Sequence, residues 1–168
     1  MPPQDRERLI ATLPQLTAYA LALVRGAERA RDLVQETALR ALGARNIPRE
    51  PAAFRSWLFA ILRNAAIDAF RRERLEAGEP APPPPIPWPV DDSRIAAITV
   101  RQGLAALGPE AREILVLVDV AGFTYAEAAE FLGVPTGTVM SRLSRARAAM
   151  LAAIGETTVH PLRTRHGR

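Results

Sequence analysis

The sequence predicts an all-α protein built from two small helical domains that are joined by a proline-rich linker. Apolar residues recur at helical rather than alternating spacing almost everywhere along the 168 residues. Seven prolines fall between positions 76 and 93, where they remove backbone donors and end the helical pattern. The predicted units are therefore a front domain at 1–75, the linker at 76–93, a back domain at 94–154 and a basic tail at 155–168.

Three helical stretches are expected in the front domain, at 9–24, 27–42 and 52–75. Pro48 and Pro51 mark the connection between the second and the third. Periodicity predicts that 52–75 is one continuous helix. The inward residues of the second stretch are expected to be Val34, Ala38, Ala41 and Leu42, and those of the third Phe54, Leu58, Ile61 and Leu62.

A polar strip lies beside the inward face of the second stretch. Its members stand at positions i, i+3, i+4 and i+7 of a helix and so share one face: Asp32, Gln35, Glu36 and Leu39. A polar strip with an exposed leucine suits a protein-docking surface. A solvated helix face is the commoner explanation of such a pattern, and both readings stay open at this point.

The third stretch combines aromatic residues with arginines. Aromatic rings stack on unpaired bases, and arginines follow a phosphate backbone. Each aromatic residue taken alone is more often part of a core, so the functional hypothesis rests on residues beyond the inward stripe. Trp57, Arg63 and Asn64 are therefore the candidates for a nucleic-acid-binding edge.

The back domain is expected to contain a helix at about 109–121, which opens at Pro109 and closes at Gly122. Its apolar residues are expected to cover the next two helices from behind, and they are Ile114, Leu115, Leu117 and Val118.

Residues 122–151 predict two short helices joined by a tight turn. Thr124 and Glu127 have the spacing of a capping box. Gly133 stands where the first helix must end, because glycine adopts a left-handed backbone at little cost, and Pro135 suits the start of the second helix. The buried stripe of that second helix is expected to be Val139, Leu143, Ala146 and Met150.

The opposite face of the second helix is small, hydroxylated and basic. It consists of Gly137, Thr138, Ser141, Ser144, Arg145 and Ala148, with Arg142 and Arg147 on its flanks. Such a face fits the major groove of DNA, where arginine binds guanine and hydroxyls reach bases or phosphates. An ordinary helical hairpin with solvated arginines is the alternative. The agreement of cap, turn glycine, buried stripe and basic face favours a DNA-binding helix-turn-helix.

Composition argues against several classes of protein. The chain has no cysteine, and its only histidines, His160 and His166, lie in the tail. We therefore expect no enzyme, no metal site and no cofactor. No apolar run reaches the roughly 18 residues that span a membrane, and the amino terminus does not resemble an export signal, so a cytoplasmic protein without membrane insertion is expected. The front domain holds 13 arginines against 8 acidic residues, which suits nucleic acid.

Three segments, in this order and across a linker, resemble the extracytoplasmic-function class of RNA polymerase sigma factors, the smallest bacterial transcription initiation factors. They are RARDLVQETALRAL from Arg29, FRSWLFAILRNAAIDAFRRE from Phe54, and LGPEAREILVLVDVAGFTYAEAAEFLGVPTGTVMSRLSRARAAML from Leu107. The resemblance covers about residues 9–154. It implies that the front domain is sigma region 2 and the back domain sigma region 4.

The resemblance also implies three sets of contact residues. Those that dock on the polymerase β′ clamp helices would be Asp32, Gln35, Glu36 and Leu39. Those that open and bind the minus-10 element would be Trp57, Arg63, Asn64, Ala65, Ala66, Arg71 and Arg72. Those that read the minus-35 element would be Thr138, Ser141, Arg142, Ser144 and Arg145. The family breaks the 52–75 stretch near Arg63 into a base-capturing loop, whereas periodicity predicts an unbroken helix.

The partners implied are core RNA polymerase, through its β′ clamp helices and its β flap, promoter DNA, and an anti-sigma protein that holds the factor inactive. Within the family, LVQETALRA and WLFAILRN most resemble the general-stress-response group. Two other functions share these motifs. A stand-alone helix-turn-helix regulator would need a dimer interface, and a sigma-mimicking adaptor would titrate an anti-sigma protein without contacting promoters.

Overall fold

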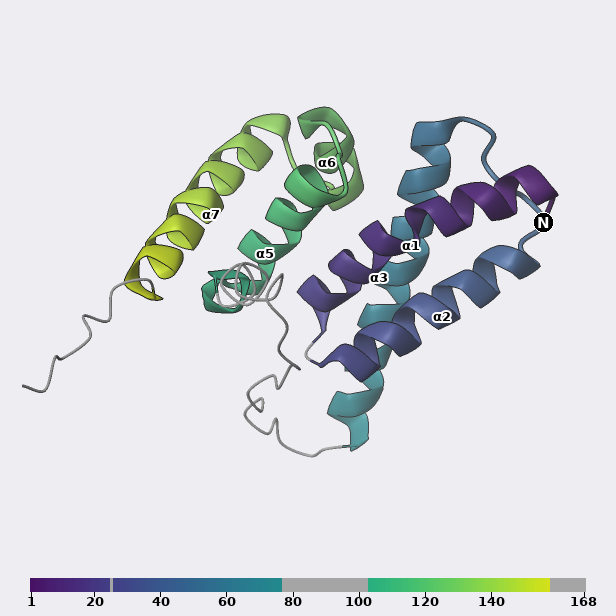
Figure 1. Cartoon of the computed structure of the whole chain (residues 1–168), viewed down its shortest axis with the longest axis horizontal. Coiled ribbons are helices and arrows are strands. Elements are labelled where there is room, and N and C mark those ends of the chain that lie inside the picture. Colours follow the sequence, from purple (N-terminus) through teal and green to yellow (C-terminus); the bar gives the residue numbers. More distant parts are fainter. Residues whose placement is uncertain (25, 77–102, 158–168) are drawn as a thin grey trace, which may run out of the picture.

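The computed structural model describes residues 1–24, 26–76 and 103–157, and all its regular elements in those ranges are helices (Figure 1). In chain order they are α1 (Pro3–Leu23), α2 (Ala27–Gly43), α3 (Pro51–Glu76), α5 (Pro109–Leu115), the π-helical turn η1 (Val116–Val120), α6 (Tyr125–Leu132) and α7 (Thr136–Thr157). The predicted all-α class is confirmed. The predicted linker from residue 77 onward and the tail from residue 158 lie outside the described residues.

In the front domain α1, α2 and α3 pack against one another in all three pairs. Helix α1 begins at Pro3 rather than at Leu9. Its first turn has no apolar periodicity to reveal it, but it carries proline at the start and Asp5 near the positive end of the helix dipole, both of which favour a helix start. The guanidinium of Arg8 lies 4.1 Å from the ring centre of Phe54 and fixes this first part of α1 on α3.

The inward face of α2 differs from the prediction. Its buried residues are Ala30, Leu33, Thr37 and Ala41, while Val34 and Ala38 are half-buried and Leu42 is exposed. The predicted stripe was thus rotated by about one residue. Thr37 is buried without a loss of hydrogen bonding because its hydroxyl donates to the Leu33 carbonyl of its own helix, at 2.7 Å.

Helix α3 is continuous from Pro51 to Glu76, as periodicity predicts and unlike the broken form that the resemblance implies. Its buried residues include three of the four predicted, Phe54, Leu58 and Leu62, while Ile61 is half-buried.

The helix expected at 109–121 ends in a π-helical turn. α5 is α-helical to Leu115, and η1 follows, with the Ala121 N–H donating to the Val116 carbonyl at 2.9 Å. Gly122 then takes a left-handed backbone with φ of 71°, which allows the chain to turn into α6. Of the apolar residues predicted to cover the helix-turn-helix, three are buried and one is half-buried. The buried ones are Ile114, Leu115 and Leu117, and the half-buried one is Val118.

The two predicted domains are packed against each other through one continuous hydrophobic core. α1 contacts α5 and η1, and α3 contacts α6. Four aromatic rings meet at this junction, two from each side: Tyr19, Phe59, Phe123 and Phe131. Their successive ring centres are 5.0 Å (Tyr19–Phe59), 5.1 Å (Phe59–Phe123) and 5.6 Å (Phe123–Phe131) apart, within the range in which aromatic rings attract one another; the last two pairs are edge-to-face and the first is tilted. We call these four residues the aromatic junction.

Candidate DNA and polymerase interfaces

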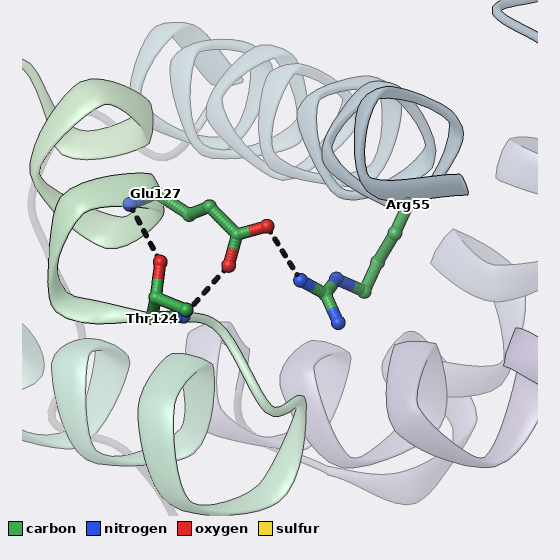
Figure 2. A network of polar contacts seen from close by, with 3 residues as sticks. All are labelled: Arg55, Thr124 and Glu127. Atoms are coloured by element: carbon green, nitrogen blue, oxygen red, sulfur yellow. Dashed lines mark hydrogen bonds and ion pairs between the residues drawn. The ribbon is translucent and has the colours of Figure 1, made fainter. Parts of the chain in front are cut away.

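The start of α6 has the predicted capping box. The Glu127 N–H donates to the Thr124 hydroxyl at 3.2 Å, and the Thr124 N–H donates to the Glu127 carboxylate at 2.7 Å (Figure 2). These bonds satisfy two backbone donors that the helix itself leaves free. The hydrogen bond from the Thr124 backbone, then that from the Thr124 hydroxyl and the positive charge of Arg55, hold the pKa of Glu127 below its ordinary value.

The turn between α6 and α7 is built on Gly133, whose φ of 67° and ψ of 35° place it in the left-handed region. The N–H of Val134 donates to the Ala129 carbonyl at 3.0 Å and closes the end of α6. The Pro135 carbonyl then accepts the N–H groups of Thr138 and Val139, so Pro135 directly precedes the first turn of α7. The helix-turn-helix predicted from the sequence is therefore present.

The two faces of α7 are divided as predicted. Val139, Leu143 and Ala146 are buried and Met150 is half-buried. On the other face, Ser141, Ser144 and Arg145 are exposed, with Thr138 half-buried at its edge. The Arg145 guanidinium rests on the Ser141 carbonyl at 3.2 Å, an exposed contact within the same helix that a base or phosphate can replace.

The arginines on the flanks of α7 pair with carboxylates instead. Arg147 makes a two-pronged contact with Asp119 of η1, and this contact raises the pKa of the Arg147 guanidinium. Arg142 lies 3.2 Å from a carboxylate oxygen of Glu110 on α5. Arg147 therefore links α7 to η1. Arg142, which belongs to the predicted minus-35 set, is paired with α5 in this conformation.

All four residues of the α2 polar strip are exposed: Asp32, Gln35, Glu36 and Leu39. A groove of about 560 Å³ lies beside the strip. Asp32 and Glu36 of α2 line one side of it, and Phe70 and Arg72 of α3 line the other. The strip is therefore available to a partner, and it is continuous with the carboxyl-terminal half of α3.

The residues predicted to bind the minus-10 element point in three directions. Successive residues of a helix are turned by about 100°, so Trp57, Asn64 and Arg71, at seven-residue spacing, fall on one face of α3. Asn64, Arg71 and Arg72 are exposed, and Trp57 is half-buried with its ring centre 5.7 Å from that of Phe54.

Ala65 and Ala66 lie in the core of the front domain. The unbroken helix turns both side chains inward in this conformation, and their predicted contact with DNA stays a prediction.

Arg63 belongs to a different face of α3. Arg55, Phe59 and Arg63, at four-residue spacing, form a stripe that meets the back domain. The Arg63 Nε donates to the Glu113 carboxylate at 2.9 Å, and this bond raises the pKa of the Arg63 guanidinium. The same oxygen accepts the Tyr19 hydroxyl at 2.7 Å. Burial, and then the charge of Glu113, raise the pKa of Tyr19, so it stays a neutral donor.

Comparison with known proteins decides the family. The model of "Sigma-70 region 2" matches residues 9–76, and that of "Sigma-70, region 4" matches residues 98–150. The ECF RNA polymerase sigma factor EcfG of Rhodopseudomonas palustris (strain TIE-1) is 36% identical over 152 residues, which are 89% of this chain and 84% of that protein. The chain belongs to the extracytoplasmic-function (ECF) sigma factors. It is thus a transcription initiation factor.

Other members of the family are similarly close to this ECF sigma factor. SigM of Mycobacterium tuberculosis (strain ATCC 25618 / H37Rv) is 37% identical over 144 residues, covering 84% of this chain and 72% of that protein. Among solved structures, the sigma factor RpoE from Bartonella quintana, determined with the anti-sigma factor NepR, has a TM-score of 0.73 at 28% identity and covers 90% of this chain and 97% of its own. CnrH, determined with the cytosolic domain of CnrY, has a TM-score of 0.61 at 27% identity, with 91% and 86% covered.

Sequence reasoning missed the residues with which region 2 of this ECF sigma factor contacts region 4. Tyr19 and Phe59 were not assigned to a contact between domains, nor were Arg55, Glu113 and Glu127. The four-residue spacing of Arg55, Phe59 and Arg63 is the one signal in the sequence that could have indicated a second interface of α3.

Within the described ranges, no group of three or more acidic or histidine side chains is placed to hold a metal ion. In the same part of the chain, no helix is both long enough and apolar enough to cross a lipid bilayer.

Proposed function

We propose that this sigma factor uses three separate surfaces during initiation, and that the exposed face of α7 reads the minus-35 element. The single observation that supports this most strongly is the division of α7 into a buried stripe of Val139, Leu143 and Ala146 and an exposed face of Ser141, Ser144 and Arg145. Small hydroxylated residues let the helix approach the base edges, and an unburied arginine forks onto guanine. Thr138 and Arg142 lie at the edges of this face.

The second surface is the α2 strip of Asp32, Gln35, Glu36 and Leu39, which we assign to core RNA polymerase. Leu39 is 59% exposed, although an aliphatic side chain gains nothing from water, and it shares its helix face with the exposed carboxylates of Asp32 and Glu36. A mixed apolar and acidic strip of this kind fits a partner surface with basic rims and an apolar centre. The β′ clamp helices are the proposed partner, and region 4 would contact the β flap.

The third surface is the exposed face of α3 with Trp57, Asn64, Arg71 and Arg72, which we assign to the minus-10 element. Its arginines suit the phosphate backbone and its indole suits an unstacked base. Arg63 joins this surface only when its bond to Glu113 is broken, because the two are in contact in the present conformation. The polymerase holds both regions on one DNA, so two weak contacts act together.

These assignments fit a cytoplasmic protein that performs no chemistry of its own, since RNA synthesis belongs to the polymerase. The relatives RpoE and CnrH were determined with NepR and with CnrY, and we propose that an anti-sigma protein likewise regulates this chain. We also propose that the chain belongs to the general-stress-response group, which LVQETALRA and WLFAILRN most resemble.

Run-off transcription with purified core polymerase on genomic fragments tests the proposal. We expect specific start sites with the wild-type protein and few with Leu39→Ala. Ile10→Ala is the matched control, because Ile10 is an equally exposed aliphatic residue of the same domain, at 64%, outside the strip. The absence of specific start sites with the wild type, or equal loss in both variants, would overturn the polymerase assignment.

A further inference from the structure

The contact between region 2 and region 4 combines an apolar centre with polar contacts at its edge. Tyr19 and Phe59 of region 2 are fully buried, at 0% exposure, against Phe123 and Phe131 of region 4. Burial this complete requires the two regions to be closed on each other, because separation would leave both rings facing water. The closed arrangement is therefore a specific packed state and not a loose encounter.

Glu113 of α5 is the polar centre of this contact. One of its carboxylate oxygens accepts hydrogen bonds from Tyr19 on α1 and from Arg63 on α3. Its side chain is only 14% exposed. A carboxylate this far out of water needs such donors to offset its lost hydration, and both donors belong to region 2, so both bonds are lost when the regions separate.

A second contact lies on the other side of the aromatic junction. Arg55 of α3 donates to the Glu127 carboxylate at 2.9 Å, on the oxygen that the capping box leaves free (Figure 2). The Arg55 guanidinium also lies 4.7 Å from the ring centre of Phe123. Arg55 and Arg63 thus flank Phe59 on one stripe of α3, and each is held by a carboxylate of region 4.

The carboxylates of α5 also reach the other DNA-binding surface. Glu110 pairs with Arg142 of α7, and a cavity of about 190 Å³ is lined by both pairs, Arg63 with Glu113 and Arg142 with Glu110. The two pairs are unequal. The Glu110 side chain is 74% exposed, and an ion pair at such a position contributes little because solvent screens its charges. Of these two pairs only Glu113 with Arg63 joins the two regions, because Glu110 and Arg142 both belong to region 4.

We propose that Glu113 is an internal latch: it holds region 4 on region 2 and occupies Arg63 in place of DNA. Separation of the regions exchanges the carboxylate for phosphate or base oxygens, which are chemically equivalent acceptors for a guanidinium. The free factor is then inhibited by its own α5 until a partner that binds the open form separates the regions. The masking of Arg63 rests on the proposed function, whereas the latch itself does not.

Two labels on the free protein test the latch. The chain has no cysteine, so Ile10→Cys and Leu151→Cys provide unique, exposed sites for a donor and an acceptor dye on α1 and α7. Glu113→Gln keeps the shape of the side chain and removes its charge. Glu130→Gln removes the same charge from an exposed position of α6 and is the matched control.

We expect lower energy transfer in Glu113→Gln than in the wild type, and no change in Glu130→Gln, with helix content verified by circular dichroism. Unchanged transfer in a folded Glu113→Gln protein would overturn the latch. This measurement involves neither polymerase nor DNA, so its failure is distinct from a failure of the run-off assay.

The masking of Arg63 is tested by fluorescence anisotropy with a short labelled single-stranded DNA of mixed sequence. Loss of one charge-assisted contact corresponds to about a tenfold change in an equilibrium constant, so Glu113→Gln is expected to bind this DNA about tenfold more tightly than the wild type. Adding Arg63→Gln should abolish the gain while energy transfer stays low. Lower transfer with unchanged DNA affinity would refute the masking and with it the proposal.

Discussion

The aromatic junction makes a quantitative prediction about the coupling of regions 2 and 4. Phe59 and Phe123 lie in different regions, both are buried, and their ring centres are 5.1 Å apart at an interplanar angle of 62°. Each single truncation to alanine should lower the free energy of unfolding by about 3 to 5 kcal/mol, because it removes a buried aromatic side chain and leaves a cavity. The double variant should lose less than the sum. The difference is the interaction of the two rings, about 0.5 to 1.5 kcal/mol.

The assay is a double-mutant cycle measured by urea unfolding of the wild type, the two single variants and the double variant. A second cycle between Phe59 and Val139 is the control, since Val139 is buried in the stripe of α7 on the helix-turn-helix. That cycle should be additive within about 0.5 kcal/mol. A coupling energy of zero between Phe59 and Phe123 would show that the two regions do not share a core in solution.

Three further predictions concern the helix-turn-helix. Thr124→Ala removes the hydroxyl that accepts the Glu127 N–H, while the backbone N–H that donates to Glu127 remains, and should lower the free energy of unfolding by about 1 kcal/mol, with Thr124→Ser close to the wild type. The pKa of Glu127 is lowered in the folded state, so its charge stabilises the fold fully above its unfolded pKa and this contribution is lost as pH falls through the folded pKa. Unfolding measured across the acid range should therefore show a shallower pH dependence for Glu127→Gln, and an identical dependence would contradict the assignment. Arg145→Ala should cost about 1 to 3 kcal/mol of minus-35 discrimination in a competition assay, and a loss spread evenly over all sequences would mark a phosphate contact instead.

The helix-turn-helix could be predicted from the sequence because each of its determinants is local. The capping box involves two residues three apart, Gly133 sets one turn, and the α7 stripe follows from helical geometry alone. The same reasoning misplaced the inward face of α2, where Thr37 is buried because its hydroxyl is satisfied within its own helix. Periodicity predicted a continuous α3 and the family pattern a break near Arg63, and the helix is continuous. The family pattern also placed Ala65 and Ala66 at a DNA surface, which a continuous helix does not allow in this conformation.

The interface between the regions could not be predicted, because its partners are far apart in the sequence. Tyr19 and Glu113 are separated by 94 positions, and Arg55 and Glu127 by 72. No spacing rule connects residues at such distances. Composition misleads here as well, since an arginine beside aromatic residues suggests nucleic acid, while a carboxylate of the same chain satisfies the same arginine.

Helix α3 explains why closure and DNA binding would compete under the proposed latch. Its three faces serve the core, region 4 and solvent, and adjacent residues such as Arg63 and Asn64 are turned by about 100° from each other. In the closed state Asn64 is exposed while Arg63 is held by Glu113, so the minus-10 set cannot act as a whole. A partner that binds only the open state has its apparent affinity reduced by the fraction of open molecules. A substitution that weakens the interface without unfolding either region should therefore strengthen binding to that partner. At a site that is already formed in the free protein, the loss of a buried contact would instead leave the binding affinity unchanged or lower it.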